Sequence, residues 1–251
     1  MHLDGLDLPP GKSTHPKLWL STDPVPFALW ARLRAVQPDT GLWPLLIAED
    51  PHLDNDPWAE ELRPGDPTDP ARHDPAGLLA AWWHDHTRVD EDDMLSPDAR
   101  RDVTAPFGAG WPGLAAAPPV GRDPEAHAAG YAARLLVEEP WRLALVPAGS
   151  GPEALVVAGW TGPANYTDTG EIAAVLRDWE RRFGIRVLGA GAATLYVSVA
   201  EPPRDRAAAL RVAAEHFAFC PDNVWQSASP YTLAAYADRL VDADGWRFWW
   251  D

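Results

Sequence analysis

The order of short β-prone runs and amphipathic helices in residues 141–251 constrains the fold of this chain more than any other feature. The runs suited to strands occur in pairs, and a helix with one apolar face follows each pair. In order, we expect strands at 141–147 and 154–160, a helix at 171–183, strands at 185–188 and 194–199, and a helix at 206–219. Two connections between strands are too short for the crossover that parallel neighbours need. The pattern therefore predicts an α+β fold, with strand-strand-helix units, a mainly antiparallel sheet and helices packed on one face.

Apolar periodicity also predicts how these elements pack. The two helices each carry a single apolar stripe, with Trp179 in the first stripe and Leu210 and Phe217 in the second. We expect these three side chains in the core and both helices on a common face of the sheet. We further expect residues 141–160 to form a hairpin that neighbours the strand pair within 185–199.

The N-terminal region, residues 1–139, is less regular. Apolar patterning predicts a strand at 45–47 and helices at 26–36, 75–86 and 125–137. An acidic, proline-rich excursion at 49–75 has no helical or strand period. We expect residues 140–251 to form the C-terminal α+β domain and leave open whether the N-terminal region packs on the same core.

Charge and composition restrict the partners. The net charge is −16, and residues 49–98 hold fifteen acidic residues against three arginines. This acidity argues against binding to nucleic acid or to an anionic membrane and favours a basic protein partner. The N-terminus does not resemble a signal peptide, and no run is long enough to span a membrane, so we expect a cytoplasmic protein. Most of the fourteen tryptophans are expected in the core.

Several segments of the C-terminal half resemble one bacterial family. They are RDWERRFGIRVL at 177–188, ATLYVSVAEPP at 193–203, AEHFAFCPDNVWQ at 214–226 and WRFWWD at 246–251. These segments resemble the family called domain of unknown function 4253, over roughly residues 140–251, with a weaker echo at 40–46. The resemblance implies a bacterial source and brings no activity, cofactor or site residue.

The turn after the 206–219 helix supplies the first candidate site. His216, Asp222, Asn223, Trp225 and Gln226 lie close together in sequence, and the turn could meet the aromatic C-terminal run at 246–250. An apolar cleft with a few fixed polar groups would then form a small-molecule or peptide site. The alternative is that Asp222 and Asn223 only cap their own turn while the tryptophans are buried.

Metal chemistry and nucleophilic chemistry are weaker alternatives. His216 and Cys220 lie four residues apart, which suits a thiol–imidazole pair or two metal ligands, but apolar neighbours favour burial of both. The acidic runs at 54–56 and 90–93 do not follow the ligand order of an EF-hand loop. The histidines of the acidic region are His52, His73, His84 and His86.

Two function classes remain open. The absence of a complete catalytic motif, together with the acidity, favours a non-catalytic binding or interaction protein of a regulatory or immunity type, with no cofactor and no metal site. The alternative is a metal-assisted hydrolase that uses the histidines of the acidic region.

Overall fold

The computed structural model describes residues 2–3, 5–15, 18–48, 67–89, 96–119, 121–163, 165–226 and 229–251. The strands are β1 (His2–Leu3), β2 (Leu6–Asp7), β3 (Gly11–His15), β4 (Leu18–Ser21), β5 (Leu42–Ala48), β6 (Trp141–Pro147), β7 (Ile185–Ala190), β8 (Thr194–Val199) and β9 (Gly245–Trp249). The helices are α1 (Phe27–Thr40), η1 (Pro70–Arg72), α3 (Pro75–Thr87), α4 (Pro97–Val103), α5 (Pro124–Glu138), α6 (Gly151–Ala158), α7 (Thr169–Phe183), α8 (Arg206–Phe219), α9 (Asp222–Trp225) and α10 (Leu233–Leu240).

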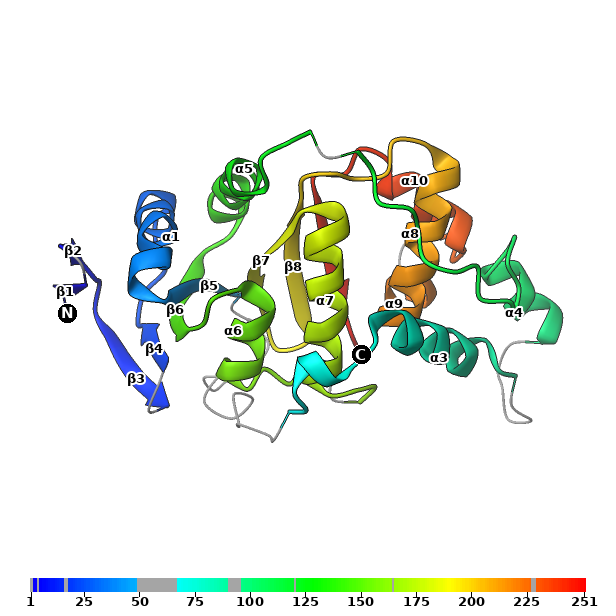
Figure 1. Cartoon of the computed structure of the whole chain (residues 1–251), viewed down its shortest axis with the longest axis horizontal. Helices are drawn as coiled ribbons and strands as arrows, with labels where there is room; N and C mark the ends of the chain where they lie inside the picture. The colour runs from blue at the N-terminus through cyan, green and yellow to red at the C-terminus, as the bar shows by residue number, and fades with distance from the viewer. Residues whose placement is uncertain are drawn as a thin grey trace.

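A seven-stranded sheet organises the chain, with the order β3-β4-β6-β5-β7-β8-β9 (Figure 1). Every neighbouring pair is antiparallel except β5 and β7, which run parallel. The predicted α+β class with a mainly antiparallel sheet is therefore confirmed. Three strands of this sheet, β3 to β5, come from the region that precedes residue 140.

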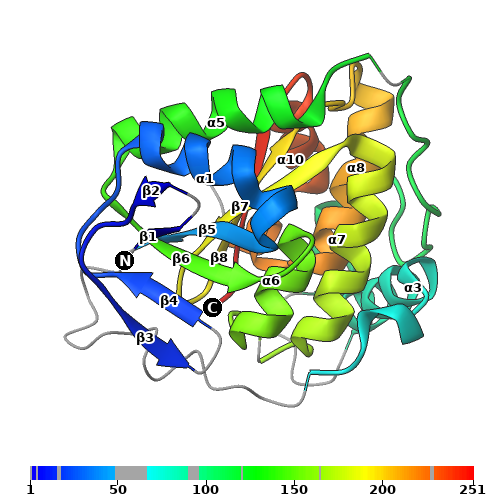
Figure 2. The same cartoon turned by 60° about the vertical axis from the view of Figure 1, so that its left-hand side comes forward.

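Helices cover both faces of the sheet (Figure 2). In the C-terminal half, α6, α7 and α8 pack on one face around a large apolar cluster. A common face was predicted for α7 and α8, whereas no helix was predicted at α6. Helices α1 and α5 pack on the opposite face, where Trp30, Leu33, Ala128 and Leu135 contact the sheet. This second helical layer comes from the N-terminal region and was not part of the prediction.

The predicted hairpin at 141–160 is wrong in its second strand. Residues 151–158 form helix α6 instead. The Ser150 side chain accepts a hydrogen bond from the Glu153 amide, Pro152 lies in the first turn, and Gly159 ends the helix with a φ of 69°. These start and stop signals outweigh the strand preference of the valines in the segment.

The predicted order of the strands in the sheet is also wrong at one position. Strand β5 lies between β6 and β7, so the strand at 141–147 does not contact the pair within 185–199. The local pattern of the C-terminal half holds no information about a strand that is inserted from residues 42–48. The register pairs Leu46 with both Leu143 of β6 and Gly189 of β7.

Tryptophans dominate the core, as expected. Trp179 and Phe217 are fully buried, whereas Leu210 is partly exposed and packs at the edge of the cluster. Trp179 packs against Phe219, Trp246 and Phe248 at centroid distances of 4.8 to 5.6 Å. Within the described residues, no helix is long and apolar enough to cross a membrane.

We expect Trp179→Ala to lower the free energy of unfolding by about 3–5 kcal/mol, because it leaves a large cavity at the centre of the aromatic cluster. Leu210→Ala on α8 is the matched control and should cost clearly less, since that side chain is only partly buried. Urea denaturation measures both values. Equal losses for the two variants would contradict the observed difference in burial.

Candidate functional site

The turn after α8 meets the C-terminal strand. Asn223 Oδ1 accepts a hydrogen bond from the Trp249 amide at 3.1 Å, and its Nδ2 donates to the Arg247 carbonyl at 2.8 Å. Asp222 accepts hydrogen bonds from the Tyr166 hydroxyl at 2.8 Å and from the Asp251 amide at 3.1 Å. The polar groups of this turn therefore anchor the end of the chain.

A small hollow lies over this junction, with a volume of about 400 Å³. Asp222, Asn223 and Gln226 line it together with Trp249, so the structure places three of the predicted site residues around one hollow. The amide of Asn223 is already used by its hydrogen bonds to β9, and the carboxylate of Asp222 by those to Tyr166 and Asp251. This hollow stays a predicted binding site.

The other two predicted residues lie elsewhere. Trp225 packs against His86 and Phe217 and borders a separate cavity of about 110 Å³. His216 is fully buried, and its Nδ1 lies 3.0 Å from the Tyr236 hydroxyl. Its Nε2 has no hydrogen-bond partner in the described part of the chain. Burial, with a smaller effect from the charge of Arg182, holds the pKa of His216 well below its ordinary value.

Cys220 is also buried, and its thiol donates a hydrogen bond to the Trp249 carbonyl at 2.9 Å. Burial raises the pKa of this thiol far above its ordinary value. A buried neutral thiol is a poor nucleophile and a poor metal ligand. The structure therefore favours a packing role for Cys220, as the apolar neighbours in the sequence predicted.

One of the histidines of the acidic region lies beside carboxylates. Ligand atoms of His73, Asp168 and Glu171 lie within 4.8 Å of one another. Each is already hydrogen-bonded, however. His73 Nε2 lies 2.6 Å from the Thr68 hydroxyl, Asp168 caps α7, and Glu171 accepts a hydrogen bond from a threonine hydroxyl. His84 and His86 are not part of this group, and His52 and the acidic runs at 54–56 and 90–93 lie outside the described residues.

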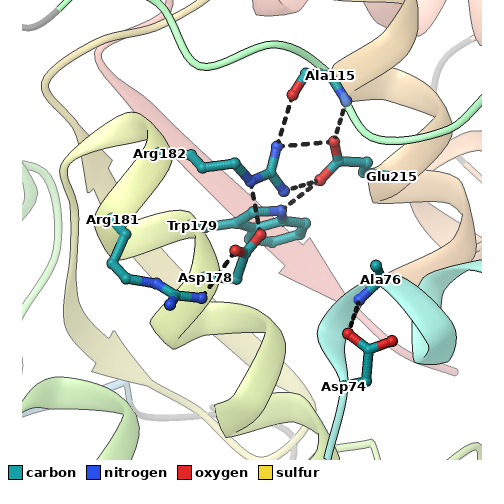
Figure 3. A network of polar contacts seen from close by, with 8 residues as sticks. All are labelled: Asp74, Ala76, Ala115, Asp178, Trp179, Arg181, Arg182 and Glu215. Atoms are coloured by element: carbon teal, nitrogen blue, oxygen red, sulfur yellow. Dashed lines mark hydrogen bonds and ion pairs between the residues drawn. The ribbon is translucent and has the colours of Figure 1, made fainter.

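A buried ion pair connects α7 and α8 (Figure 3). Glu215 on α8 is fully buried and accepts hydrogen bonds from two Arg182 nitrogens at 3.0 and 2.5 Å. It also accepts from Trp179 Nε1 at 2.7 Å and from the Ala115 amide at 2.6 Å. Arg182 donates in turn to Asp178 and to the Ala115 carbonyl. Every oxygen of Glu215 has donors within the fold, so this network is structural.

A cleft with a volume of about 1260 Å³ opens among the described residues. It lies between α1 and α5 on one side and α7 on the other, beside the first residues of β5 and β7. Segment 70–75 and the β6–α6 loop at Gly149 and Ser150 complete its wall. The cleft therefore lies where the N-terminal helices meet the C-terminal half of the sheet.

Arginines are concentrated in this cleft. The Arg34 guanidinium stacks on the Trp43 ring, 3.9 Å from its centroid. Arg34 and Arg186 both pair with Glu125, at 2.9 and 2.6 Å. Stacking and pairing hold the two guanidiniums in place, and one carboxylate between two arginines leaves one positive charge uncompensated.

Helix α7 contributes Arg177, Glu180 and Arg181 to the same cleft, at the three- and four-residue spacing of one helix face. Arg181 pairs with Asp178 at 3.0 Å. Neither Arg177 nor Glu180 has a hydrogen bond or an ion pair within the described structure. Burial raises the pKa of Glu180 to about 7, although the nearby arginines oppose this shift. A strongly shifted carboxyl group in a cleft is typical of functional sites.

The sequence pattern did not reveal this cleft. Arg34 and Glu125 lie in the N-terminal region, whereas Arg177, Glu180 and Arg186 lie in the C-terminal half, and no local motif joins them. The available signal was the group of three arginines in the 177–182 segment of a chain that is otherwise strongly acidic. That segment was assigned to an amphipathic helix and to the family resemblance, and not to a binding site.

Comparison with known proteins gives one match. Residues 142–251 match the family model described as domain of unknown function (DUF4253). No curated protein matches the chain, and no solved structure does. The matched residues include Arg177, Glu180 and Arg186 of the cleft, while Arg34 and Glu125 precede them.

We expect Arg182→Leu to lower the free energy of unfolding by about 3–5 kcal/mol, because it leaves the Glu215 carboxylate buried without its ion-pair partner. Arg181→Leu, one residue away with a side chain that is 72% exposed, should change the value by less than about 0.5 kcal/mol. Urea denaturation at neutral pH compares the two variants. A small effect of Arg182→Leu would show that the pair does not stabilise the fold.

We expect Glu180→Gln to stabilise the protein more at pH 8 than at pH 5, by about 1–3 kcal/mol. A carboxyl group whose pKa is raised in the folded state binds more protons there than in the unfolded chain. The wild type therefore loses stability as the pH rises from about 4.5 to about 7, and the glutamine variant does not share this loss. A pH-independent difference between the two unfolding curves would contradict the raised pKa.

Proposed function

We propose that this protein, whose residues 142–251 match the DUF4253 model, is a non-catalytic binding protein. Its ligand site is the cleft between α1, α5 and α7. The ligand is a small organic molecule that carries a carboxylate or phosphate group. The observation that carries this proposal is the convergence of Arg34, Arg177, Arg181 and Arg186 on one cleft of a chain with a net charge of −16.

The pairing of these arginines supports an anionic ligand. Glu125 is shared by two of them, and Asp178 pairs with Arg181, so Arg177 keeps its full donor capacity. Guanidinium donors form a planar fork that matches a carboxylate or a phosphate. The four arginines of the cleft attract anions, in contrast to the net negative charge of the whole chain.

The size and walls of the cleft support a ligand with an apolar body. Its volume exceeds the usual range of small-molecule sites, about 300–1,000 Å³, so the ligand need not fill it. Small apolar side chains form much of the wall, namely Ala31, Ala35, Ala71, Ala126, Ala129 and Ala174, with Pro38, Pro70 and Pro75. Such walls complement an aliphatic group that lies beside the charged end of a ligand.

Two other functions have weaker support. Capture of a basic protein partner rests on the net charge, and many of the acids in residues 49–98 lie outside the described residues. A metal-assisted hydrolase would use His73 with Asp168 and Glu171, and the hydrogen bonds of these groups would have to break first. Isothermal titration with Zn²⁺ on the wild type and on His73→Ala tests the second alternative.

We expect at least one of inorganic phosphate, succinate and L-leucine to bind the wild-type protein in isothermal titration calorimetry. Arg177→Met and Arg186→Met should each weaken that binding by about 10- to 100-fold, since each removes hydrogen bonds between charged groups. Arg206→Met is the control, because Arg206 pairs with Asp238 outside the cleft. Absence of binding, or binding that neither cleft variant changes, would contradict the proposal.

A further inference from the structure

Two oppositely charged side chains on α7 border the cleft, and among the described residues neither makes a hydrogen bond or an ion pair. Arg177 and Glu180 are three residues apart, which places their Cβ atoms about 5–6 Å from each other on one face of the helix. Their charges attract each other across the helix face, but no ion pair joins the two side chains in the described structure. The cleft therefore offers a guanidinium and a carboxyl group, side by side, whose hydrogen-bonding capacity the described residues do not use.

We infer that the ligand is an amino-carboxylate zwitterion, either a free amino acid or a short peptide with unblocked ends, whose carboxylate lies against Arg177 and whose ammonium group lies against Glu180. This inference rests on the proposed binding function of the cleft and names its ligand class.

The charges in the cleft favour a zwitterion over a simple anion. The group of Arg34, Arg186 and Glu125 has one excess positive charge, and Arg177 adds another. A carboxylate satisfies these donors, but a ligand with only negative groups leaves Glu180 facing an anion in a largely desolvated position. An ammonium group on the same ligand gives the Glu180 carboxylate the hydrogen-bond donor that it lacks.

The proton balance follows from the state of Glu180. With a pKa of about 7, this carboxyl group is partly protonated at neutral pH before the ligand binds. An ammonium group stabilises the carboxylate form, so a zwitterion displaces a proton, whereas an anion makes the carboxyl group take one up. The charged or titratable groups that face it are Arg177 and Arg181 on α7, Arg186 on β7, Arg34 on α1, Glu125 in the first turn of α5, Asp123 before that helix, and His73 after η1.

Three matched ligands test the inference. They are L-leucine, N-acetyl-L-leucine, which lacks the ammonium group, and L-leucinamide, which lacks the carboxylate. The same three forms of the dipeptide leucyl-leucine (free, N-acetylated and C-amidated) are also tested. Comparison of the two series shows whether the site prefers a single amino acid or a short peptide. We expect each blocked form to bind the wild-type protein at least about tenfold more weakly than the zwitterion does.

Two variants assign the ends of the ligand. Glu180→Gln should remove the preference for a free amine, so that the acetylated and free forms bind within about threefold of each other. Arg177→Met should remove the preference for a free carboxylate in the same way, and Arg206→Met should leave both preferences intact. Thermal unfolding first verifies that each variant is folded.

Titration in two buffers with different ionisation enthalpies measures the protons exchanged on binding. Net proton release near pH 7, which persists in His73→Ala and disappears in Glu180→Gln, supports the inference. In a different outcome, the acetylated ligand binds the wild type as tightly as the zwitterion does, and Arg177→Met weakens the binding of both. That result would exclude the zwitterion inference and leave the anion-binding function in place. If none of these ligands, nor succinate or phosphate, binds, both proposals fail.

Discussion

The buried contact between Arg182 and Glu215 holds together parts of the molecule that no backbone ladder joins. Glu215 projects from α8, Arg182 and Trp179 come from α7, and Ala115 belongs to the segment that crosses over both helices. Loss of any of these donors would leave the Glu215 carboxylate with fewer hydrogen bonds in an interior that solvates charge poorly, which would destabilise the fold. The contact therefore fixes the orientation of α7 on the sheet. It thereby also fixes where the opposite face of that helix points.

That opposite side forms one wall of the cleft, and the N-terminal region forms the other. Glu125 connects the two, because it pairs with Arg34 on α1 and with Arg186 on β7. Insertion of β5 between β6 and β7 brings Trp43 under Arg34 and places the start of the strand at the cleft. The residues that match the DUF4253 model contribute Arg177, Glu180 and Arg186, whereas the aromatic ring of Trp43 and the shared carboxylate of Glu125 come from the preceding part of the chain. The site we propose thus depends on both parts of the chain.

The sequence predicted the features that local periodicity encodes. Helices α7 and α8 and strands β7 and β8 follow from their apolar repeats, and the fold class follows from the order of these elements. Residues 154–158 were predicted as a strand because valines favour strands, yet Ser150, Pro152 and Gly159 make them a helix. The position of β5 and the convergence of Arg34 with Arg177 depend on contacts between distant segments, which periodicity does not record. Asn223 was predicted near the C-terminal strand, and the structure places it there by hydrogen bonds to that strand.

Two glutamates in this fold show why the cleft differs from the core. Glu215 is fully buried and receives donors on both oxygens, so its burial is compensated and it serves packing. Glu180 is half-buried, has no donor in the described structure, and has a pKa of about 7. A glutamate at this position of α7 that served only solubility would be exposed to solvent. A glutamate that served stability would form an ion pair with Arg177, three residues earlier on the helix. Glu180 does neither. Its ionisation lowers the stability of the folded state as the pH rises from about 4.5 to about 7, and a strongly shifted carboxyl group in a cleft is typical of a functional site.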